Sequence, residues 1–196
     1  MAGITDLTGG QILFDGQPIQ SQYDQLAYVC GEGSYFSTMT PMEYHSFLAS
    51  FFPRFNHKRY RKLMEFFDLD PKQTIGKMST GQRAKLEVAA GMSKGARYLL
   101  MDEPFLGKDM FTRQDFLKLM AGSLHGEETI LLATHHVEEI EPFIDRAIVM
   151  HKSRVAADEL MDDLRAQGED LVGLLQKATG YDPQKYQDLF AEDDIS

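Results

Sequence analysis

Lys77-Met-Ser-Thr-Gly-Gln-Arg83, followed at a short distance by Tyr98-Leu-Leu-Met-Asp-Glu-Pro104, carries the strongest structural signals in this chain. The serine and the glutamine of the first segment have the spacing of a capping box, which predicts a helix that begins at this turn. The backbone N–H groups at such a helix start carry positive partial charge and can bind a phosphate. In the second segment an apolar run ends in Asp102 and Glu103, as in a buried parallel strand that places carboxylates at its C-terminal edge. Two acids in that position are suited to binding Mg²⁺ and to activating a water molecule.

The segments around this stretch predict strands and helices that alternate along the chain. Apolar runs predict strands over 26–29, 98–101 and 129–133, the last two buried. Helical patterns are expected over 41–69, with a break at 53–56, and over 79–93, 111–124 and 136–143. β-Hairpins are expected over 11–19 and 146–156, and an acidic helical tail over 158–196, broken at Gly168 and Gly180. Such alternation is typical of an α/β fold.

Three motifs resemble those of the ATP-binding-cassette (ABC) ATPase family. Residues 78–82 resemble its signature loop, usually Leu-Ser-Gly-Gly-Gln, residues 98–103 resemble its Walker B strand, and residues 133–135 resemble its switch-histidine loop. The resemblance covers nearly the whole chain. It implies an α/β, P-loop NTPase-like ABC cassette core with a helical subdomain and remnants of an antiparallel β subdomain. We therefore expect one ABC ATPase domain over 1–196, divided into a helical subdomain at about 39–93, the remaining α/β core at 94–157 and the helical tail at 158–196.

The resemblance gives roles to the residues at the strand ends. Asp102 is expected to hold Mg²⁺ through water, Glu103 to polarise the attacking water, and His135 to contact the γ-phosphate of ATP. Two acids after a strand can also be merely solvated, and a lone histidine is often structural. His136 is expected to be the surface residue of the histidine pair. Glu32 lies near the position of a metal-binding glutamine in the family, so it is expected either to contact Mg²⁺ or to be a solvated acid.

The signature loop and one further loop have expected roles across a dimer. In the family, the positions of Ser79, Thr80, Gly81 and Gln82 contact the γ-phosphate of ATP that a second subunit holds. Ser79 can alternatively do no more than cap its own helix. Thr80 replaces a glycine of the family motif and is expected to crowd the phosphate. Asp109 matches the final residue of the family's D-loop, which couples the two ATP sites.

One family motif has no match in this sequence. None of the 196 residues forms the pattern G-x-x-x-x-G-K-[ST], the Walker A loop whose amides and lysine hold phosphates. The first residues resemble the family segment that follows this loop, so we expect the chain to be N-terminally incomplete, either as a truncated reading frame or as a true relic. A cassette without its first strands is expected to expose an apolar sheet edge, which favours self-association or low stability.

The composition excludes several classes of protein. A single cysteine, Cys30, excludes a disulfide framework and fits a reducing cytosol. No apolar run approaches the ~18 residues that span a bilayer, and the start lacks the features of a signal peptide. The formal net charge of −10 disfavours a nucleic-acid partner, because such binders carry a basic face. We expect a cytoplasmic protein that lies at the inner face of the membrane through a membrane partner.

Two functions remain open. The first is the ATP-hydrolysing subunit of an ABC transporter, with ATP and Mg²⁺ as cofactors, a second ABC ATPase subunit as dimer partner and an integral membrane subunit as the driven component. In this reading the chain is not expected to bind ATP by itself. The second is a non-catalytic module that donates its signature-loop residues to a complete partner subunit. ABC proteins that act on ribosomes or DNA are disfavoured by the acidic charge and the absence of a long insertion.

An aromatic-rich stretch lies in and beside the expected helical subdomain. Most of its members are expected to be core residues, and a few to remain exposed as a socket for a coupling helix of the membrane subunit. The members are Tyr35, Phe36, Tyr44, Phe47, Phe51, Phe52 and Phe55.

Overall fold

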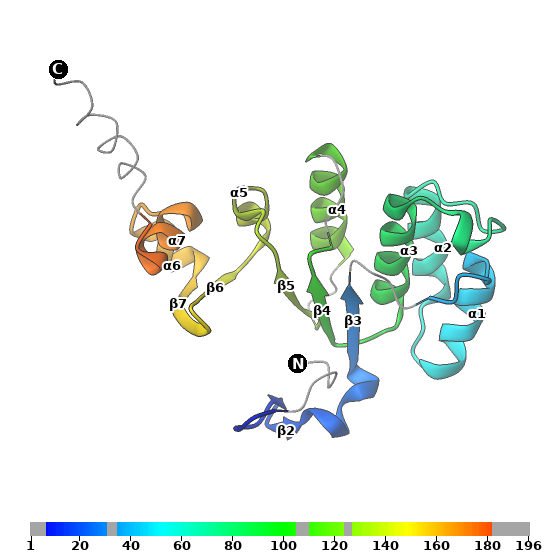
Figure 1. The fold of residues 1–196 in the computed structure, drawn as a ribbon, viewed down its shortest axis with the longest axis horizontal. Helices are drawn as coiled ribbons and strands as arrows, with labels where there is room; N and C mark the ends of the chain where they lie inside the picture. The colour runs from blue at the N-terminus through cyan, green and yellow to red at the C-terminus, as the bar shows by residue number, and fades with distance from the viewer. Residues whose placement is uncertain (1–6, 31–34, 105–109, 124–126, 182–196) are drawn as a thin grey trace, which may run out of the picture. The chain divides into compact units, whose positions relative to one another are not determined.

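The computed structural model describes residues 7–30, 35–104, 110–123 and 127–181 (Figure 1). The chain divides into two compact units, Met1–His135 and His136–Ser196. None of the helices in the described ranges combines the length and the apolar character that a membrane crossing needs.

The first unit is built on a parallel sheet of three strands in the order β3-β4-β5 (Figure 1). The strands are β3 (Leu26–Cys30), β4 (Tyr98–Asp102) and β5 (Thr129–Ala133). The register pairs Cys30 with Asp102 and Asp102 with Ala133, so the three C-terminal strand ends lie side by side. The loops that follow the strands therefore leave the sheet at one edge, as expected for an α/β fold.

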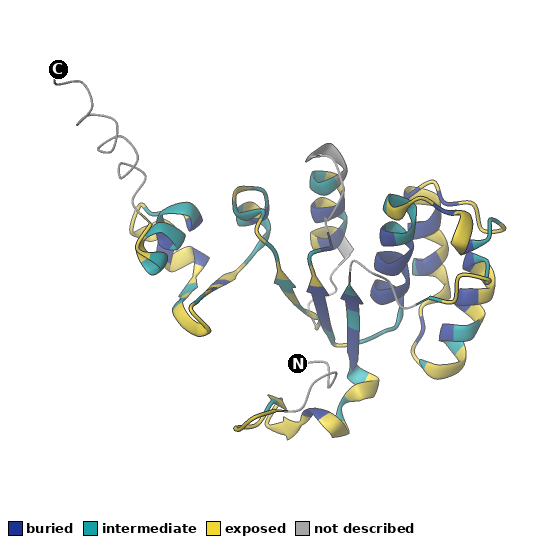
Figure 2. Ribbon diagram, in the orientation of Figure 1, coloured by how far each residue is buried: buried dark blue, intermediate teal, exposed yellow. Residues whose placement is uncertain are grey.

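The two strands that the sequence predicts to be buried differ in burial (Figure 2). In β4, Leu99, Leu100 and Met101 are buried. In β5 no residue is buried, and exposed residues alternate with half-buried ones. The expectation of a buried strand is therefore wrong for β5. The reason is that β4 pairs on both sides, whereas β5 pairs only with β4 in the part of the chain that the structure describes.

Three helices of the first unit lie within residues 39–93, the stretch expected to be a helical subdomain. The break predicted near residues 53–56 is confirmed, because Asn56 caps the second helix by accepting a hydrogen bond from the Arg59 backbone N–H at 2.8 Å. The third helix packs closely on β3 at Gly91, where an added Cβ atom would lie 2.3 Å from Val29 Cγ2. The helices are α1 (Pro41–Phe51), α2 (His57–Phe66) and α3 (Thr80–Ser93).

The remaining elements of the first unit are one helix, one hairpin and short 3₁₀ turns. Phe116, Leu117 and Met120 of α4 (Met110–Ser123) are buried. The predicted hairpin over 11–19 is confirmed as two short antiparallel strands, β1 (Leu13–Phe14) and β2 (Gln17–Pro18). The 3₁₀ turns are η1 (Ile19–Ser21), η2 (Tyr23–Gln25) and η3 (Ile75–Lys77).

The second unit contains an antiparallel hairpin and short helices. The hairpin confirms the one predicted over 146–156, but its second strand continues to Leu160. The helical tail expected from 158 therefore begins at Met161, because Asp158 pairs with β6 and accepts two hydrogen bonds from Arg146 at 2.6 and 2.7 Å. Left-handed glycines end the helices at the two predicted breaks, with φ of 72° at Gly168 and 68° at Gly180. The elements are α5 (Val137–Ile140), η4 (Glu141–Phe143), β6 (Arg146–His151), β7 (Arg154–Leu160), α6 (Met161–Ala166) and α7 (Leu171–Thr179).

Candidate functional site

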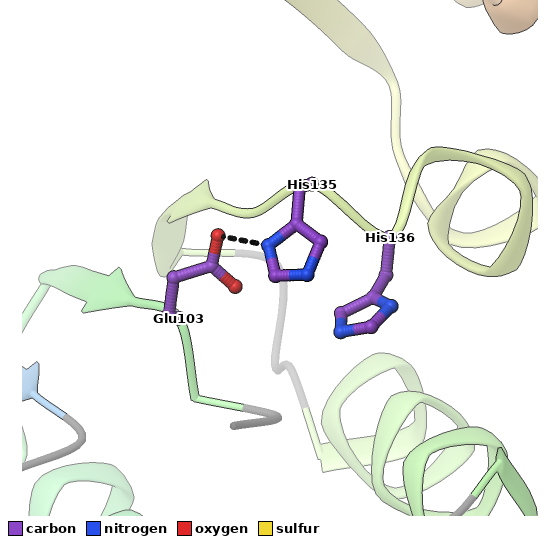
Figure 3. Close-up of side chains that lie close together, drawn as sticks. All are labelled: Glu103, His135 and His136. Carbon is purple, nitrogen blue, oxygen red and sulfur yellow. Dashed lines mark hydrogen bonds and ion pairs between the residues drawn. The ribbon is translucent and has the colours of Figure 1, made fainter. Parts of the chain in front are cut away.

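Glu103 and His135 meet at the C-terminal edge of the sheet (Figure 3). Glu103 follows the last residue of β4, and His135 lies two residues beyond β5. His135 Nδ1 is 2.7 Å from Glu103 Oε1, and the Thr134 hydroxyl donates to Glu103 Oε2 at 3.2 Å. The parallel register of β4 and β5 explains why residues so far apart in the sequence meet. Both oxygens of the carboxylate are therefore held by the loop after β5.

The backbone of Glu103 adopts an unusual conformation. Its φ of 44° lies in the left-handed region, which costs a non-glycine residue about 1–2 kcal/mol. A hydrogen bond of 2.9 Å from its backbone N–H to the Ala133 carbonyl helps to hold this conformation. Strain of this kind is typical of functional sites, where the surrounding structure fixes a side chain in a required position.

The hydrogen bond to Glu103 also indicates which nitrogen of the His135 ring is the donor. An ionised carboxylate only accepts hydrogen bonds, so Nδ1 of His135 carries a proton and Nε2 is the acceptor nitrogen of the neutral ring. The His135 side chain is 67% exposed and that of Glu103 is 32% exposed. The pair is thus accessible to a ligand, and its carboxylate can accept a proton from a water molecule.

His136 differs from the expectation that it is the surface member of the two histidines. Its side chain is 23% exposed, and its Nδ1 lies 3.9 Å from Glu139 Oε1 within the second unit. His136 is the N-cap of α5, whereas His135 lies one residue earlier, in the loop after β5, and is the exposed histidine.

Asp102 ends β4 and is exposed. The Tyr28 hydroxyl donates to Asp102 Oδ2 over a long 3.5 Å, and burial, followed by the charge of Asp102, raises the pKa of Tyr28. The Asp102 carboxylate thus lies at the C-terminal edge of the sheet, directly before Glu103 in the chain. Its oxygens are of the kind that a hard cation such as Mg²⁺ binds. The second expected metal contact, Glu32, lies outside the described residues.

The capping box predicted at the signature loop is confirmed. Ser79 is the N-cap of α3: its hydroxyl accepts from the Gln82 backbone N–H at 3.2 Å, and its own N–H donates to Gln82 Oε1 at 2.9 Å. The backbone N–H groups of Thr80 and Gly81 follow at the helix start, where no preceding turn supplies acceptors. Capping by Ser79 therefore leaves an anion-binding helix end in place.

Arg83 is a residue at this helix end that sequence reasoning missed. Its guanidinium donates to the Met78 carbonyl at 2.8 Å and to the Thr80 hydroxyl at 3.3 Å. It thus holds the side chain of Thr80 and adds positive charge beside the helix start. The i, i+3 spacing of Thr80 and Arg83 on one helix was the available signal.

The expected site residues fall into two groups on one side of the first unit. Asp102, Glu103 and His135 gather at the C-terminal edge of the sheet, and residues 79–82 form the N-terminus of α3. Only residues 94–97 connect the end of α3 to the start of β4, so α3 runs back along the sheet and its N-terminus faces the same side as the strand ends (Figure 1). Asp109 lies outside the described residues.

The sequence of this chain is similar to those of ABC transporter proteins. The model of a family described as ABC transporter matches residues 1–106. Daunorubicin resistance ATP-binding protein DrrA3 of Streptomyces coeruleorubidus is 31% identical over 125 residues, which are 62% of this chain and 40% of that protein. ABC transporter ATP-binding protein YtrB of Bacillus subtilis (strain 168) is 25% identical over 162 residues, 81% of this chain and 56% of that protein. The chain thus spans about half the length of these relatives.

Solved structures share the fold. The structure of an ATP-binding subunit of an ABC transporter matches with a TM-score of 0.74 and 22% identity, covering 97% of this chain and 79% of that one. CbiO1 from Clostridium perfringens, described as part of the ABC transporter complex cbiONQ, matches with a TM-score of 0.66 and 21% identity, covering 96% and 79%. The predicted α/β architecture is confirmed by these matches.

Proposed function

The chain belongs to the ABC transporter family of ATP-binding domains, and from this premise we propose that it is an ATP-binding and ATP-hydrolysing subunit that powers transport across a membrane. The observation that carries this proposal is the Glu103 carboxylate, which His135 at 2.7 Å and Thr134 at 3.2 Å hold at the end of β4. A carboxylate fixed in this way is suited to take a proton from an attacking water molecule.

The groups on this side of the first unit fit ATP and Mg²⁺ by their chemistry. ATP bound with Mg²⁺ supplies the transferred phosphoryl group and the divalent charge that screens it. Among the protein groups, the Asp102 carboxylate would hold the cation through water. Glu103 would accept the water proton, and His135 would keep the Glu103 carboxylate in position. The N–H groups of Thr80 and Gly81 would donate to phosphate oxygens.

We place the signature loop opposite a second ABC ATPase subunit. In this arrangement two subunits enclose ATP, and residues 79–82 of one face the phosphates held by the Walker A loop of the other. Support comes from the helix end itself, whose capping box orders the loop and leaves its first N–H groups available. The same support applies if this chain contributes only its signature loop.

A non-catalytic module that donates its signature loop to a complete partner is the second candidate. The observation that favours it is the ordered helix start at Ser79 and Gln82, whose first N–H groups could donate to a phosphate without any part played by Glu103. Thr80, which occupies a glycine position of the family motif and is held by Arg83 at 3.3 Å, would weaken this contact by crowding the phosphate. In this case Glu103 of this chain would have no part in turnover.

An exposed aromatic surface supports a membrane subunit as the further partner. Phe36 and Phe47 lie edge to face at a centroid distance of 5.3 Å, and Phe47 and Phe51 follow at 4.9 Å. Phe36 and Phe51 are exposed, whereas Tyr44 and Phe55 of the same aromatic stretch are buried, so the stretch contains both core and surface members. We assign the exposed members to an integral membrane subunit, which would place this chain in the cytoplasm at the inner face of the membrane.

The proposal is tested by measuring ATP turnover of the chain assembled with its second ABC subunit. Glu103→Gln is expected to lower turnover by about 10²- to 10⁴-fold, because the amide cannot accept the water proton. Glu65→Gln on the exposed face of α2 is the matched control and should leave turnover unchanged. Loss with Ser79→Ala but none with Glu103→Gln would reject the catalytic subunit and establish the donating module. No loss with either would contradict both candidates.

A further inference from the structure

Two histidines connect α1 to α2 through a hydrogen bond. His45 Nε2 of α1 lies 2.9 Å from His57 Nδ1, the first residue of α2. His45 is 8% exposed, and its Nδ1 is a buried atom without a hydrogen-bond partner in the described part of the chain. Aromatic rings surround it, with Phe55 at 5.3 Å and Tyr60 at 5.0 Å between ring centroids. In the part of the chain that the structure describes, the His45 ring therefore packs among aromatic rings and hydrogen-bonds to His57.

A hydrogen bond between His45 and His57 needs one proton, not two, on the two nitrogens that face each other. At 2.9 Å one ring nitrogen donates and the other must accept, so it has to be unprotonated. Full protonation of both rings would set two N–H groups and two positive charges against each other. The contact is therefore stable when at least one ring is neutral and is broken when both are charged.

The surroundings of the pair oppose added positive charge. From α2, His57, Tyr60 and Arg61 face His45, and none of them is an acid. From α3, Glu87 accepts a hydrogen bond from the adjacent Tyr44 at 3.2 Å rather than from His45. His57 occupies the first turn of α2, where the helix dipole is positive and no acidic side chain is present.

We propose that the pair formed by His45 and His57 is a proton-sensitive contact that holds α1 and α2 together near neutral pH and releases them as the pH falls. The signature helix would respond to this release. The Arg59 guanidinium of α2 donates to the Met92 carbonyl of α3 at 3.0 Å, and the Asn56 backbone N–H donates to the Ser93 carbonyl at 2.7 Å. The end of α3 is thus held by residues one and two positions from His57 in the chain. A change in pH would in this way alter the support of the helix that carries the signature loop.

The direction of the pH dependence follows from the pKa of His45. Burial, followed by the charges of His57 and Arg61, lowers this pKa below its ordinary value. A histidine in the unfolded chain titrates near pH 6.5, so below that pH the unfolded state binds more protons than the folded state. The contribution of the pair is fully present above about pH 6.5 and is lost as the pH falls from there towards the folded pKa.

The experiment compares urea unfolding of the full chain at about pH 7.5 and about pH 5.5, on either side of the ordinary histidine pKa. The unfolding midpoint of the wild type should fall at the lower pH. In His45→Phe, which keeps an aromatic ring in the pocket, and in His57→Gln, at an exposed position, this fall should be smaller. His151→Gln at the last residue of β6 is the control, and its unfolding midpoint should fall as that of the wild type does.

Two outcomes would overturn the proposal. One is an equal pH dependence in the wild type and in His57→Gln, a substitution at the surface that keeps the answer available if His45→Phe does not fold. The other is a His45 ring that titrates at or above pH 6.5 in an NMR titration of the folded chain. The experiment needs no nucleotide, so its failure is separate from failure of the proposed ATPase function.

Discussion

β4 and β5 are neighbouring strands of one parallel sheet with nearly the same apolar pattern, Tyr-Leu-Leu-Met-Asp and Thr-Ile-Leu-Leu-Ala, and yet they are buried to different degrees. Met101 in β4 is 2% exposed, whereas Leu131 in β5 is 39% exposed. β4 pairs with a strand on each side, and β5 pairs with one strand in the described part of the chain. An apolar run therefore predicts a strand, while its burial depends on neighbours that the run itself does not contain.

Alanine substitutions in the two strands give the largest expected difference. Met101→Ala should lower the free energy of unfolding by about 2–5 kcal/mol, because it leaves a cavity in a closed core. Leu131→Ala should cost less than about 1 kcal/mol, because its side chain is already partly in water. Urea unfolding of the full chain, compared at constant m-value, measures both losses of free energy. Equal losses would mean that β5 is as well covered in solution as β4.

The packing of α3 against β3 is the next way to test how tightly the sheet is covered. Gly91→Ala would place a methyl group 2.3 Å from Val29 Cγ2. Such overpacking should cost about 1–3 kcal/mol, and the helix propensity of alanine would offset part of it. Gly122→Ala in α4, where an added Cβ meets no atom within 4 Å, is the matched control and should be neutral or stabilising by up to about 1 kcal/mol. A stable Gly91→Ala variant would show that the contact between α3 and β3 yields easily.

Local signals in the sequence predicted most of the first unit. The capping box of Ser79 and Gln82 located the start of α3, and Asn56 marked the start of α2. These predictions succeeded because capping depends on residues three positions apart. Burial of β5 failed as a prediction because it depends on strand pairing, and the extension of β7 to Leu160 was missed because it depends on pairing with β6.

In the candidate site, too, motifs within one segment could be predicted, whereas contacts between segments could not. Asp102, Glu103 and His135 could be chosen from strand-end positions and motif resemblance, and the parallel register then brings Glu103 and His135 together. The contact of Thr134 with Glu103 could not be predicted, because no sequence pattern indicates the left-handed backbone at Glu103, with φ of 44°. The histidine pair was missed as well, because His45 and His57 lie on separate helices and match no motif.

One edge of β5 has no partner strand among the described residues, and it gives the prediction with the smallest effect on stability. An unpaired strand edge with exposed apolar residues favours association between copies of a chain, and a lysine on such an edge opposes it. Leu131→Lys should therefore reduce any concentration-dependent self-association seen by sedimentation velocity, while changing the free energy of unfolding by less than about 1 kcal/mol. Ile148→Lys makes the same exchange at an exposed position of the second unit and is the control. A reduction with Ile148→Lys but not with Leu131→Lys would assign association to the β6–β7 face, and the contrast between β4 and β5 would then have no consequence for assembly.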